Sequence, residues 1–328
     1  MRGAITNEPP LVEIENLSVD FATSRGAMHV LRDVSLTLAP RRIVGLVGES
    51  GSGKSTLALA LLGLLPTNAT GVTGRIDLSG VDLLSLPPER IEALRGNRIA
   101  MIFQDPMTAL NPVFTLATQL IDAQRRKFPR LSRSELLERA AKMLTRVGIS
   151  DARARLSAYP HQLSGGQRQR VMIAMALLCE PDVLIADEPT TALDVTIEAQ
   201  IVDLLKELRE EFAGSIVFVS HSLGLISDLC DEVAVMYAGK IVESGPTAEV
   251  FADPRHPYTQ ALLACEIDPG HDFSERLVTI KGELPDLVAV PQGCIFAPRC
   301  PSRFEKCGTE PPPLHVAPTH AAACWLVE

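Results

Sequence analysis

The most informative segment of the chain is Gly48-Glu-Ser-Gly51-Ser-Gly53-Lys54-Ser55-Thr56, which contains the Walker A pattern. It follows the buried apolar run Ile43–Val47 and precedes Leu57–Leu65, which has the composition of a helix. A strand, this motif and a helix in succession form the context that the pattern requires. Glycines let consecutive backbone N–H groups turn inward around phosphate oxygens, and the N-terminus of the next helix adds its dipole. The segment therefore predicts a phosphate-binding loop.

Individual roles follow from the chemistry of such loops. Lys54 is expected to reach the β- and γ-phosphates, and Ser55 is expected to ligate Mg²⁺. The alternative is a glycine-rich turn without a ligand, although the bare pattern arises by chance in only roughly one chain of this length in a hundred. The candidate nucleotide-binding residues of the loop are Gly48, Glu49, Ser50, Gly51, Ser52, Gly53, Lys54, Ser55 and Thr56.

Composition narrows the class of protein. With 328 residues, of which 46% are hydrophobic, the chain can form one large α/β core with a smaller appendage, or two modest domains. A net charge of -9 argues against a broad grip on nucleic acid. The longest apolar stretch, Val171–Ala186, is interrupted by Glu180, Pro181 and Asp182, so we expect no membrane span. Met1–Pro10 lacks the pattern of a secretory signal, and we therefore expect a cytoplasmic location.

Hydrophobic patterning predicts two kinds of sheet. Leu11–Phe21 and Ser35–Leu38 alternate apolar and polar residues, which favours an antiparallel sheet. The short apolar runs Val183–Ala186 and Ile216–Val219 are separated by the helical stretch Val195–Phe212. Short buried strands alternating with helices indicate a mostly parallel sheet, so the predicted fold class is α/β.

Changes in composition along the chain predict its organisation. The pattern is helical from Thr115 to Cys179, and Ser134–Val147 is clearly amphipathic. Beyond about residue 250 the chain becomes rich in proline and carries a cysteine-containing tail, which places a boundary near Phe251–Pro254. The predicted organisation is a main domain over 1–250, with a helical subdomain at about 108–180, and a C-terminal extension over 251–328.

A second chemical motif is Val183-Leu-Ile-Ala-Asp187-Glu188, an apolar strand that ends in two carboxylates. It would lie at the carboxyl edge of the sheet, where α/β proteins bind ligands. Asp187 would hold Mg²⁺ through water, and Glu188 would polarise the attacking water as general base. The motif is weak alone, but after a Walker A loop it is strong.

Leu163-Ser164-Gly165-Gly166-Gln167 separates this chain from other P-loop ATPases, because it resembles the signature sequence of ABC ATPases. The segment begins a predicted helix that runs to Cys179, so its amides are suited to a phosphate. In that family the element faces the γ-phosphate held by a second subunit. A simple Ser-Gly-Gly helix cap is the alternative interpretation. The candidate residues are Ser164, Gly165, Gly166 and Gln167.

Further positions match the same family one by one. Gln104 resembles the glutamine that senses Mg²⁺ and water and touches the membrane partner, although any polar residue can end a strand. Asp194 matches the loop that crosses the dimer interface, and otherwise would cap the following helix. His221 matches the switch histidine that contacts the γ-phosphate, and otherwise is an ordinary loop histidine. Phe21 is our candidate for stacking on adenine, or alternatively a core residue.

Two segments restrict the resemblance to one subfamily of ABC ATPases. They are Phe103-Gln-Asp-Pro-Met-Thr-Ala-Leu-Asn-Pro112 and Arg255-His-Pro-Tyr-Thr-Gln-Ala-Leu-Leu263. Both are similar to the ATPase subunits of bacterial ABC importers for dipeptides, oligopeptides and nickel. The resemblance implies ATP hydrolysis that energises peptide import, with nickel or another small solute as the alternative cargo. A soluble ABC ATPase of DNA repair or translation would carry a long coiled-coil insertion or a second cassette, and we find neither. A docking subunit without turnover is disfavoured by the intact Glu188 and His221.

The same resemblance implies a set of partners. These are two transmembrane permease subunits, a second ABC ATPase that is either identical or related, and, indirectly, an extracytoplasmic solute-binding protein. ATP and Mg²⁺ would be the cofactors, and no nucleic acid is expected. The protein would then lie peripherally on the cytoplasmic face of the inner membrane.

Four of the seven cysteines lie in the last 35 residues, with five, six and sixteen residues between them. In a reducing compartment such a group favours a metal site over disulfides. The family resemblance implies a four-iron four-sulfur cluster, which four thiolates suit. Zinc and an unmetallated cluster remain alternatives, and the lack of a closely spaced cysteine pair disfavours structural zinc. The candidate ligands are Cys294, Cys300, Cys307 and Cys324, whereas Cys179 and Cys230 are expected to be small core residues.

Overall fold

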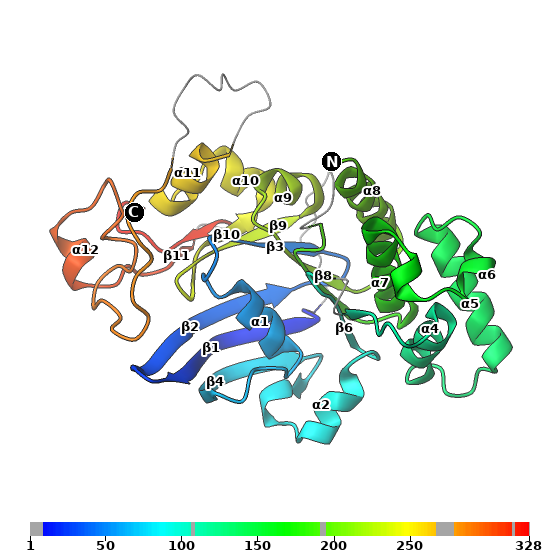
Figure 1. The fold of residues 1–328 in the computed structure, drawn as a ribbon. Coiled ribbons are helices and arrows are strands. Elements are labelled where there is room, and N and C mark those ends of the chain that lie inside the picture. Colours follow the sequence, from blue (N-terminus) through cyan, green and yellow to red (C-terminus); the bar gives the residue numbers. More distant parts are fainter. Residues whose placement is uncertain (1–8, 106–108, 191–194, 267–278, 317–318, 328) are drawn as a thin grey trace. The chain divides into compact units, whose positions relative to one another are not determined.

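The computed structural model describes residues 9–105, 109–190, 195–266, 279–316 and 319–327. The chain forms two compact units (Figure 1). The first unit contains the residues up to Leu84 together with those from Ser220 onward, and the second contains Ser85–Val219.

An antiparallel sheet opens the first unit, as the alternation of the sequence predicts. Its strand order is β2-β1-β4-β5, with β1 pairing antiparallel to both β2 and β4. In β1, Val12 and Ile14 are buried whereas Glu13 and Glu15 are exposed, so apolar side chains cover one face. The strands are β1 (Val12–Thr23), β2 (Gly26–Leu38), β4 (Ala69–Leu78) and β5 (Val81–Asp82).

The part of the second, longer sheet that lies in the first unit carries the Walker loop. Its strands follow the order β11-β12-β10-β9-β3, in which β3 and β9 are parallel and the other neighbours are antiparallel. All five residues of β3 are buried, as expected for the apolar run before the motif. Helix α1 follows the loop. The elements are β3 (Ile43–Val47), α1 (Lys54–Leu61), α9 (Leu223–Leu229), β9 (Glu232–Tyr237), β10 (Lys240–Pro246), β11 (His315–Val316) and β12 (Ala321–Ala322).

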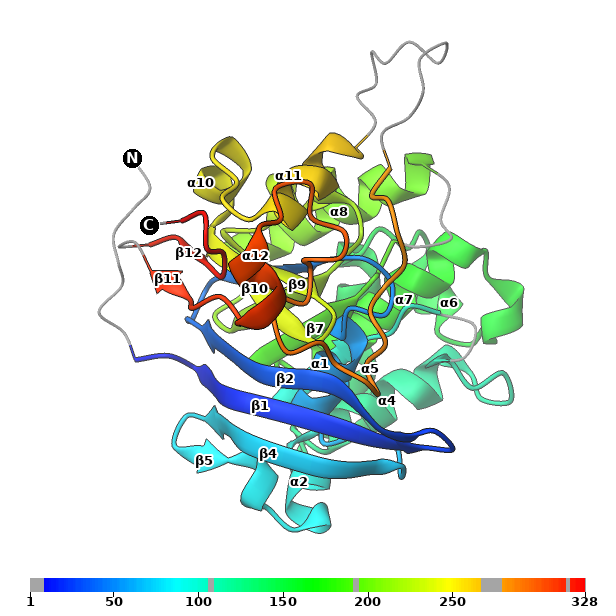
Figure 2. The same ribbon diagram turned by 90° about the vertical axis from the view of Figure 1, so that its left-hand side faces the viewer.

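The C-terminal extension is built into this second sheet. Ala322 of β12 is the register partner of Glu243 in β10, so residues near the end of the chain extend the sheet that contains β3. Figure 2 shows the orange and red extension alongside β10, within the first unit. The helices of this region are α10 (Thr247–Ala252), α11 (Pro257–Ala264) and α12 (Glu305–Thr309).

Glu243 joins three segments of the first unit at a fully buried point. Its carboxylate accepts hydrogen bonds from the backbone N–H groups of Arg255, at 2.6 Å, and His256, at 3.0 Å. The same carboxylate lies 2.7 Å from Nε2 of His320, and the Glu243 side chain is 0% exposed. A buried carboxylate needs such partners, because burial without them is very costly. Strand β10 and the extension are therefore held together by one polar node, which consists of Glu243 and its three hydrogen-bond partners.

The second unit combines a parallel sheet with a group of helices. Strands β6, β7 and β8 pair in parallel in the order β8-β7-β6, which confirms the predicted parallel sheet. Helices α4, α5 and α7 pack on one another, and the region carries helices where the sequence predicts them. The elements are α2 (Pro88–Leu94), β6 (Ile99–Ile102), α4 (Leu116–Arg125), α5 (Arg133–Arg146), α6 (Ala152–Arg155), α7 (Gly165–Leu178), β7 (Val183–Asp187), α8 (Val195–Glu211) and β8 (Ser215–Val219), with 3₁₀ turns at Leu83–Ser85 and Pro160–Gln162.

Local signals explain where these helices begin. Thr115 caps α4 by accepting a hydrogen bond from the N–H of Thr118. Ser132 and Glu135 form a reciprocal capping box at the start of α5, the helix whose amphipathic pattern is clearest in the sequence. Among the described residues, every helix is either too short or too polar to cross a bilayer. The domain boundaries at about 108, 180 and 250 stay predictions.

Removing the Glu243 carboxylate should destabilise the first unit. We expect Glu243→Ala to lower the free energy of unfolding by about 3 kcal/mol, because His320 and two backbone N–H groups lose their buried partner. Urea unfolding can be followed by the fluorescence of Trp325, the only tryptophan, which lies in the extension. Glu13→Ala, at an exposed position of β1, is the control and should leave the midpoint nearly unchanged. An unchanged midpoint in Glu243→Ala would contradict the role of this node.

Candidate nucleotide-binding site

The Walker loop adopts a backbone that only glycine tolerates at two positions. Gly48 has a φ of 148°, and a Cβ there would lie 2.1 Å from the carbonyl oxygen of Met236. Gly53 has a φ of 104°, and its Cβ would lie 2.8 Å from Leu31. Both positions combine a positive φ with a close neighbour, so any other residue would displace the loop. The fold therefore requires glycine at these two positions of the motif.

Lys54 folds back over this loop. Its Nζ donates hydrogen bonds to the carbonyl oxygens of Gly48, at 2.7 Å, and Glu49, at 3.0 Å, and the residue is 6% exposed. Helix α1 begins at Lys54 with Gly53 as N-cap, so no side chain caps its first turn. The hydroxyl of Ser52 is buried without a hydrogen-bond partner. A loop with a buried lysine and an uncapped helix start suits an anion.

Glu49 is held by residues of the C-terminal extension. Its backbone N–H donates to the hydroxyl of Tyr258 at 2.8 Å. Its carboxylate accepts two hydrogen bonds from the guanidinium of Arg299, at 2.6 and 2.9 Å, in a bidentate ion pair. The motif assigned Glu49 to nucleotide binding, whereas no sequence pattern pointed to Arg299. Tyr258 does lie in the segment Arg255–Leu263, which marked the importer resemblance, so a signal for it was present.

The acidic pair of the second unit lies at the end of β7. Asp187 is 8% exposed and closes the strand. Glu188 follows with a φ of 46°, and its N–H donates to the carbonyl of Val219. Nε2 of Gln104 donates to Oε2 of Glu188 at 2.7 Å, so the structure brings together two of the predicted catalytic residues. An amide that orients a carboxylate is suited to positioning a water molecule.

The signature segment forms a helix cap within the second unit. The hydroxyl of Ser164 accepts from the N–H of Gln167 at 3.3 Å, and the Gln167 side chain accepts from the N–H of Ser164 at 3.1 Å. This is a capping box at the start of α7. Gly165 and Gly166 occupy the first turn that follows. The segment is therefore a helix cap, and its role toward phosphate stays a prediction.

The remaining candidates are divided between the two units. His221 is exposed and stands next to Ser222, which caps α9. Phe21 is partly exposed in β1, opposite Met28, and so is not a core residue. Asp194 lies outside the described residues. The Walker loop and His221 belong to the first unit, and the second unit contains Gln104, Ser164, Asp187 and Glu188.

The cysteines fall into two groups. Burial raises the pKa of Cys179 to about 11, and Cys230 is also buried, so both act as small core residues. Among the described residues, no three His, Cys, Asp or Glu side chains gather closely enough to hold a metal ion. The geometry therefore gives no support to a metal site at the four C-terminal cysteines.

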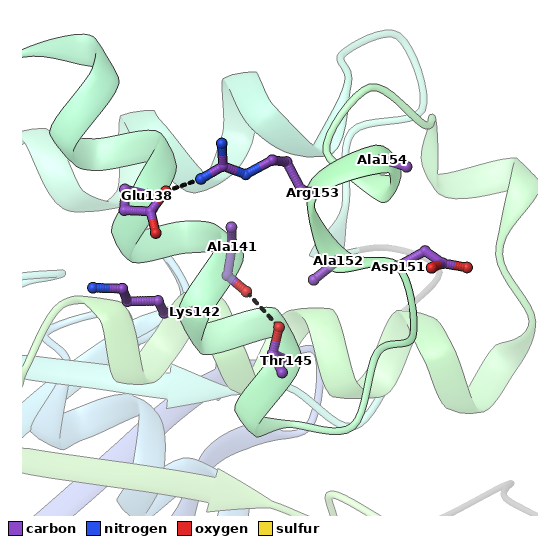
Figure 3. Close-up of a pocket in the computed structure, with 8 residues that line it drawn as sticks. All are labelled: Glu138, Ala141, Lys142, Thr145, Asp151, Ala152, Arg153 and Ala154. Carbon is purple, nitrogen blue, oxygen red and sulfur yellow. Dashed lines mark hydrogen bonds and ion pairs between the residues drawn. The ribbon is translucent and has the colours of Figure 1, made fainter.

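An open surface pocket of about 550 Å³ lies on the helical part of the second unit (Figure 3). Glu138 of α5 pairs there with Arg153 of α6, and the hydroxyl of Thr145 donates to the carbonyl of Ala141 at 3.1 Å. None of the residues predicted for nucleotide binding lines it.

A Walker loop between a buried parallel strand and a helix defines a P-loop nucleotide-binding protein. The family model described as ABC transporter matches residues 31–191, and the model for the oligopeptide/dipeptide transporter C-terminal region matches residues 242–307. The chain belongs to the ABC transporter family and is an ATP-hydrolysing member of it, which uses ATP and Mg²⁺.

Similar chains span nearly its whole length. The chain is 48% identical over 315 residues to a protein of Brucella abortus (strain 2308) named for peptide import and ATP binding, covering 96% of this chain and 94% of that one. It is 46% identical over 315 residues to the oligopeptide transport ATP-binding protein OppD of Salmonella typhimurium (strain LT2), covering 96% and 93%.

Solved structures confirm the fold. The ATP-binding cassette MJ0796, in a dimeric post-hydrolysis state bound to ADP and Pi, aligns with a TM-score of 0.64 and 27% identity, covering 72% of this chain and 98% of that one. The protein cbiO1 of Clostridium perfringens, part of the transporter complex cbiONQ, aligns with a TM-score of 0.62 and 29% identity, covering 75% and 92%. The predicted ABC ATPase fold is thus confirmed.

Filling the space at Gly48 should disable the loop. We expect Gly48→Ala to weaken ATP binding more than about tenfold, because its Cβ would collide with the Met236 carbonyl and displace the loop. Gly80→Ala is the matched control, since Gly80 has a φ of 85° but a Cβ there would meet no atom within 4 Å. The control should bind ATP normally in an equilibrium titration. Equal affinities for the two variants would refute the steric argument.

Proposed function

We propose that this chain is the ATPase subunit of an ABC importer for dipeptides or oligopeptides. The observation that carries the proposal is its similarity, along nearly its whole length, to proteins named for peptide import, including the matched C-terminal region. ATP hydrolysis by this chain would supply the energy for import. In an importer, selectivity for the solute lies chiefly in the membrane and solute-binding partners. A nickel or other small-solute importer is the nearest alternative.

The catalytic roles follow from the predicted motifs. Lys54 would bind the β- and γ-phosphates, while Ser55 and Asp187 would hold Mg²⁺, which neutralises charge on the phosphates. Glu188 would act as general base for the attacking water, and Gln104 would orient it. The hydrogen bond between Gln104 and Glu188 at 2.7 Å supports this pairing.

The working form would be a head-to-tail dimer of two ATPase domains. Each ATP would lie between the Lys54 loop of one subunit and the Ser164 segment of the other, with Asp194 at the interface and His221 at the γ-phosphate. Because ATP prefers the closed state, it would shift the equilibrium toward closure, and hydrolysis would reopen the dimer. The second subunit is either a copy of this chain or a related one.

Closure would act on membrane partners. We propose two transmembrane permease subunits, an extracytoplasmic solute-binding protein that delivers the cargo, and a peripheral position on the cytoplasmic face of the inner membrane. Residues 1–250 would form the ATPase domain and residues 251–328 the importer-specific extension.

Replacing the proposed base should separate binding from hydrolysis. We expect Glu188→Gln to lower the ATPase rate by about 10²–10⁴-fold, because the amide cannot accept the proton. ATP binding should persist, so the variant should accumulate as an ATP-bound dimer in size-exclusion chromatography with light scattering. Glu180→Gln, in the turn before β7, is the control and should keep the wild-type rate. Rapid hydrolysis by Glu188→Gln would overturn the assignment of the base.

The transporter itself can be tested with the same variant. Tagged Glu188→Gln protein, loaded with ATP, is used for affinity capture from detergent-solubilised native membranes, and the captured chains are identified by mass spectrometry. Polytopic membrane proteins together with an ATPase subunit would support the proposal. Capture of soluble nucleic-acid or ribosomal partners alone would support a soluble ABC ATPase instead.

We also propose that the four C-terminal cysteines hold a four-iron four-sulfur cluster. Burial raises the pKa of Cys294, whereas backbone N–H groups of Phe296 and Ala297 lower it, and the neighbouring Cys307 and Cys300 raise it. The charges of Cys300 and Cys307 therefore act on the thiol of Cys294. Cys294, Cys300, Cys307 and Cys324 would each supply one thiolate to the cluster. The N–H of Leu326 donates to Sγ of Cys324 at 3.5 Å, and N–H···S contacts are among the features that tune iron-sulfur centres.

Metal analysis decides among the alternatives. We expect protein purified without oxygen to contain about four irons and four acid-labile sulfides per chain, with visible absorption from the cluster. Cys300→Ser should lose both, whereas Cys179→Ser should keep them because Cys179 lies in the second unit. One zinc per chain without sulfide would establish the zinc alternative, and metal-free protein would overturn the proposal.

A further inference from the structure

Arg299 is a buried arginine whose donors are all engaged. Its side chain is 4% exposed. Nε donates to the carbonyl of Lys281 at 3.0 Å, Nη2 donates to the carbonyl of Ile280 at 3.2 Å, and Nη1 donates to the hydroxyl of Tyr237 at 3.4 Å. With the two bonds to Glu49, these contacts match the five N–H donors of a guanidinium. The geometry fixes Arg299 in one orientation, directed at the Walker loop.

Tyr258 reaches the same residue of the loop from helix α11. Its ring lies 4.6 Å from the ring of Tyr237 and 5.4 Å from that of Phe296, measured between centroids. The N–H of Tyr258 donates to Nδ1 of His256 at 3.0 Å, and burial lowers the pKa of His256 to about 4, so this nitrogen stays an acceptor near neutral pH. The Tyr258 hydroxyl is therefore held in place to accept from the N–H of Glu49.

The charge of Glu49 explains why such support is needed. A carboxylate in a loop that binds the phosphates of ATP would repel them, since like charges at close range disfavour each other. The bidentate pair with Arg299 neutralises that charge and draws the side chain toward the extension. Arg299 is buried in this pair, whereas the Glu49 side chain is 28% exposed. Because burying even one charge is costly, such a pair seldom adds much stability. Its position on the phosphate loop points to a role in binding.

We propose that Arg299 and Tyr258 are positioning residues for ATP binding, which act through Glu49 of the Walker loop. Lys54 holds the Glu49 carbonyl from within the loop, while the extension holds its N–H and its carboxylate. The loop is thereby set in its phosphate-binding form by residues more than 200 positions further along the chain. This role concerns ATP binding only and is the same for any transported solute.

The test compares ATP affinity and turnover in the full-length protein. We expect Arg299→Gln to raise the dissociation constant for ATP, and the KM, about tenfold, because Glu49 is left unpaired beside the phosphates. The kcat at saturating ATP should change less than about threefold, since the hydrolytic residues are untouched. Arg303→Gln, which removes an exposed arginine from the same segment, is the control and should match the wild type.

A second substitution distinguishes positioning from mere structural support. In the Arg299→Gln background, Glu49→Gln removes the unpaired charge and should recover most of the lost affinity.

Tyr258→Phe keeps the ring and its aromatic neighbours but removes the hydroxyl that accepts from the N–H of Glu49, and should weaken ATP binding several-fold. Arg299→Lys retains one charge without the bidentate fork and should fall between Arg299→Gln and the wild type; it also serves if Arg299→Gln does not fold. Wild-type affinity in Arg299→Lys and Tyr258→Phe, or a double variant no better than Arg299→Gln, would overturn the proposal.

Discussion

The hydrogen bonds from Lys54 to the carbonyl oxygens of Gly48 and Glu49 constrain the conformation of the Walker loop and of the elements on either side of it. The lysine is buried, so its charge must be met by polar atoms, and the loop supplies two carbonyl oxygens at 2.7 and 3.0 Å. That turn is possible only because Gly48 and Gly53 lack side chains. Strand β3 must end and helix α1 must begin where they do for this contact to exist. The antiparallel and mixed sheets of the first unit provide the rigid frame around it.

The extension adds a second layer of constraint to the same loop. Glu243 binds the extension to β10 through backbone N–H groups and His320, and this fixes the start of α11. The hydroxyl of Tyr258 in α11 accepts a hydrogen bond from the N–H of Glu49. Arg299, in the cysteine-containing segment, forms an ion pair with the Glu49 carboxylate. Polar contacts of this kind are directional, so they hold Glu49 in one position and orientation. The extension therefore belongs to the nucleotide site physically, although it lies far from it in sequence.

The sequence predicted the fold class well and the long-range contacts poorly. The apolar runs at β3 and β7, the alternation of β1 and the amphipathic pattern of α5 each report on nearby residues, so local patterns place these elements correctly. The motifs also place Gln104 and Glu188 in one site, and the two side chains are hydrogen-bonded. Arg299 carries no local pattern, because its partner Glu49 is 250 residues away. The four C-terminal cysteines indicate thiolate ligands, but their spacing in the sequence does not show which metal centre, if any, they bind.

Because the extension pairs with β10 and with the Walker loop, its exchange between related chains is restricted. A tail joined by a flexible linker could be exchanged between relatives without affecting the enzyme. Here β12 and β11 extend the sheet beyond β10, and a salt bridge from the tail ends on the Walker loop. A chimera whose new tail lacked counterparts of Arg299 and His320 would leave Glu49 and Glu243 without these partners. Recombination among such chains should therefore keep the Walker loop, strand β10 and the tail together as a matched set.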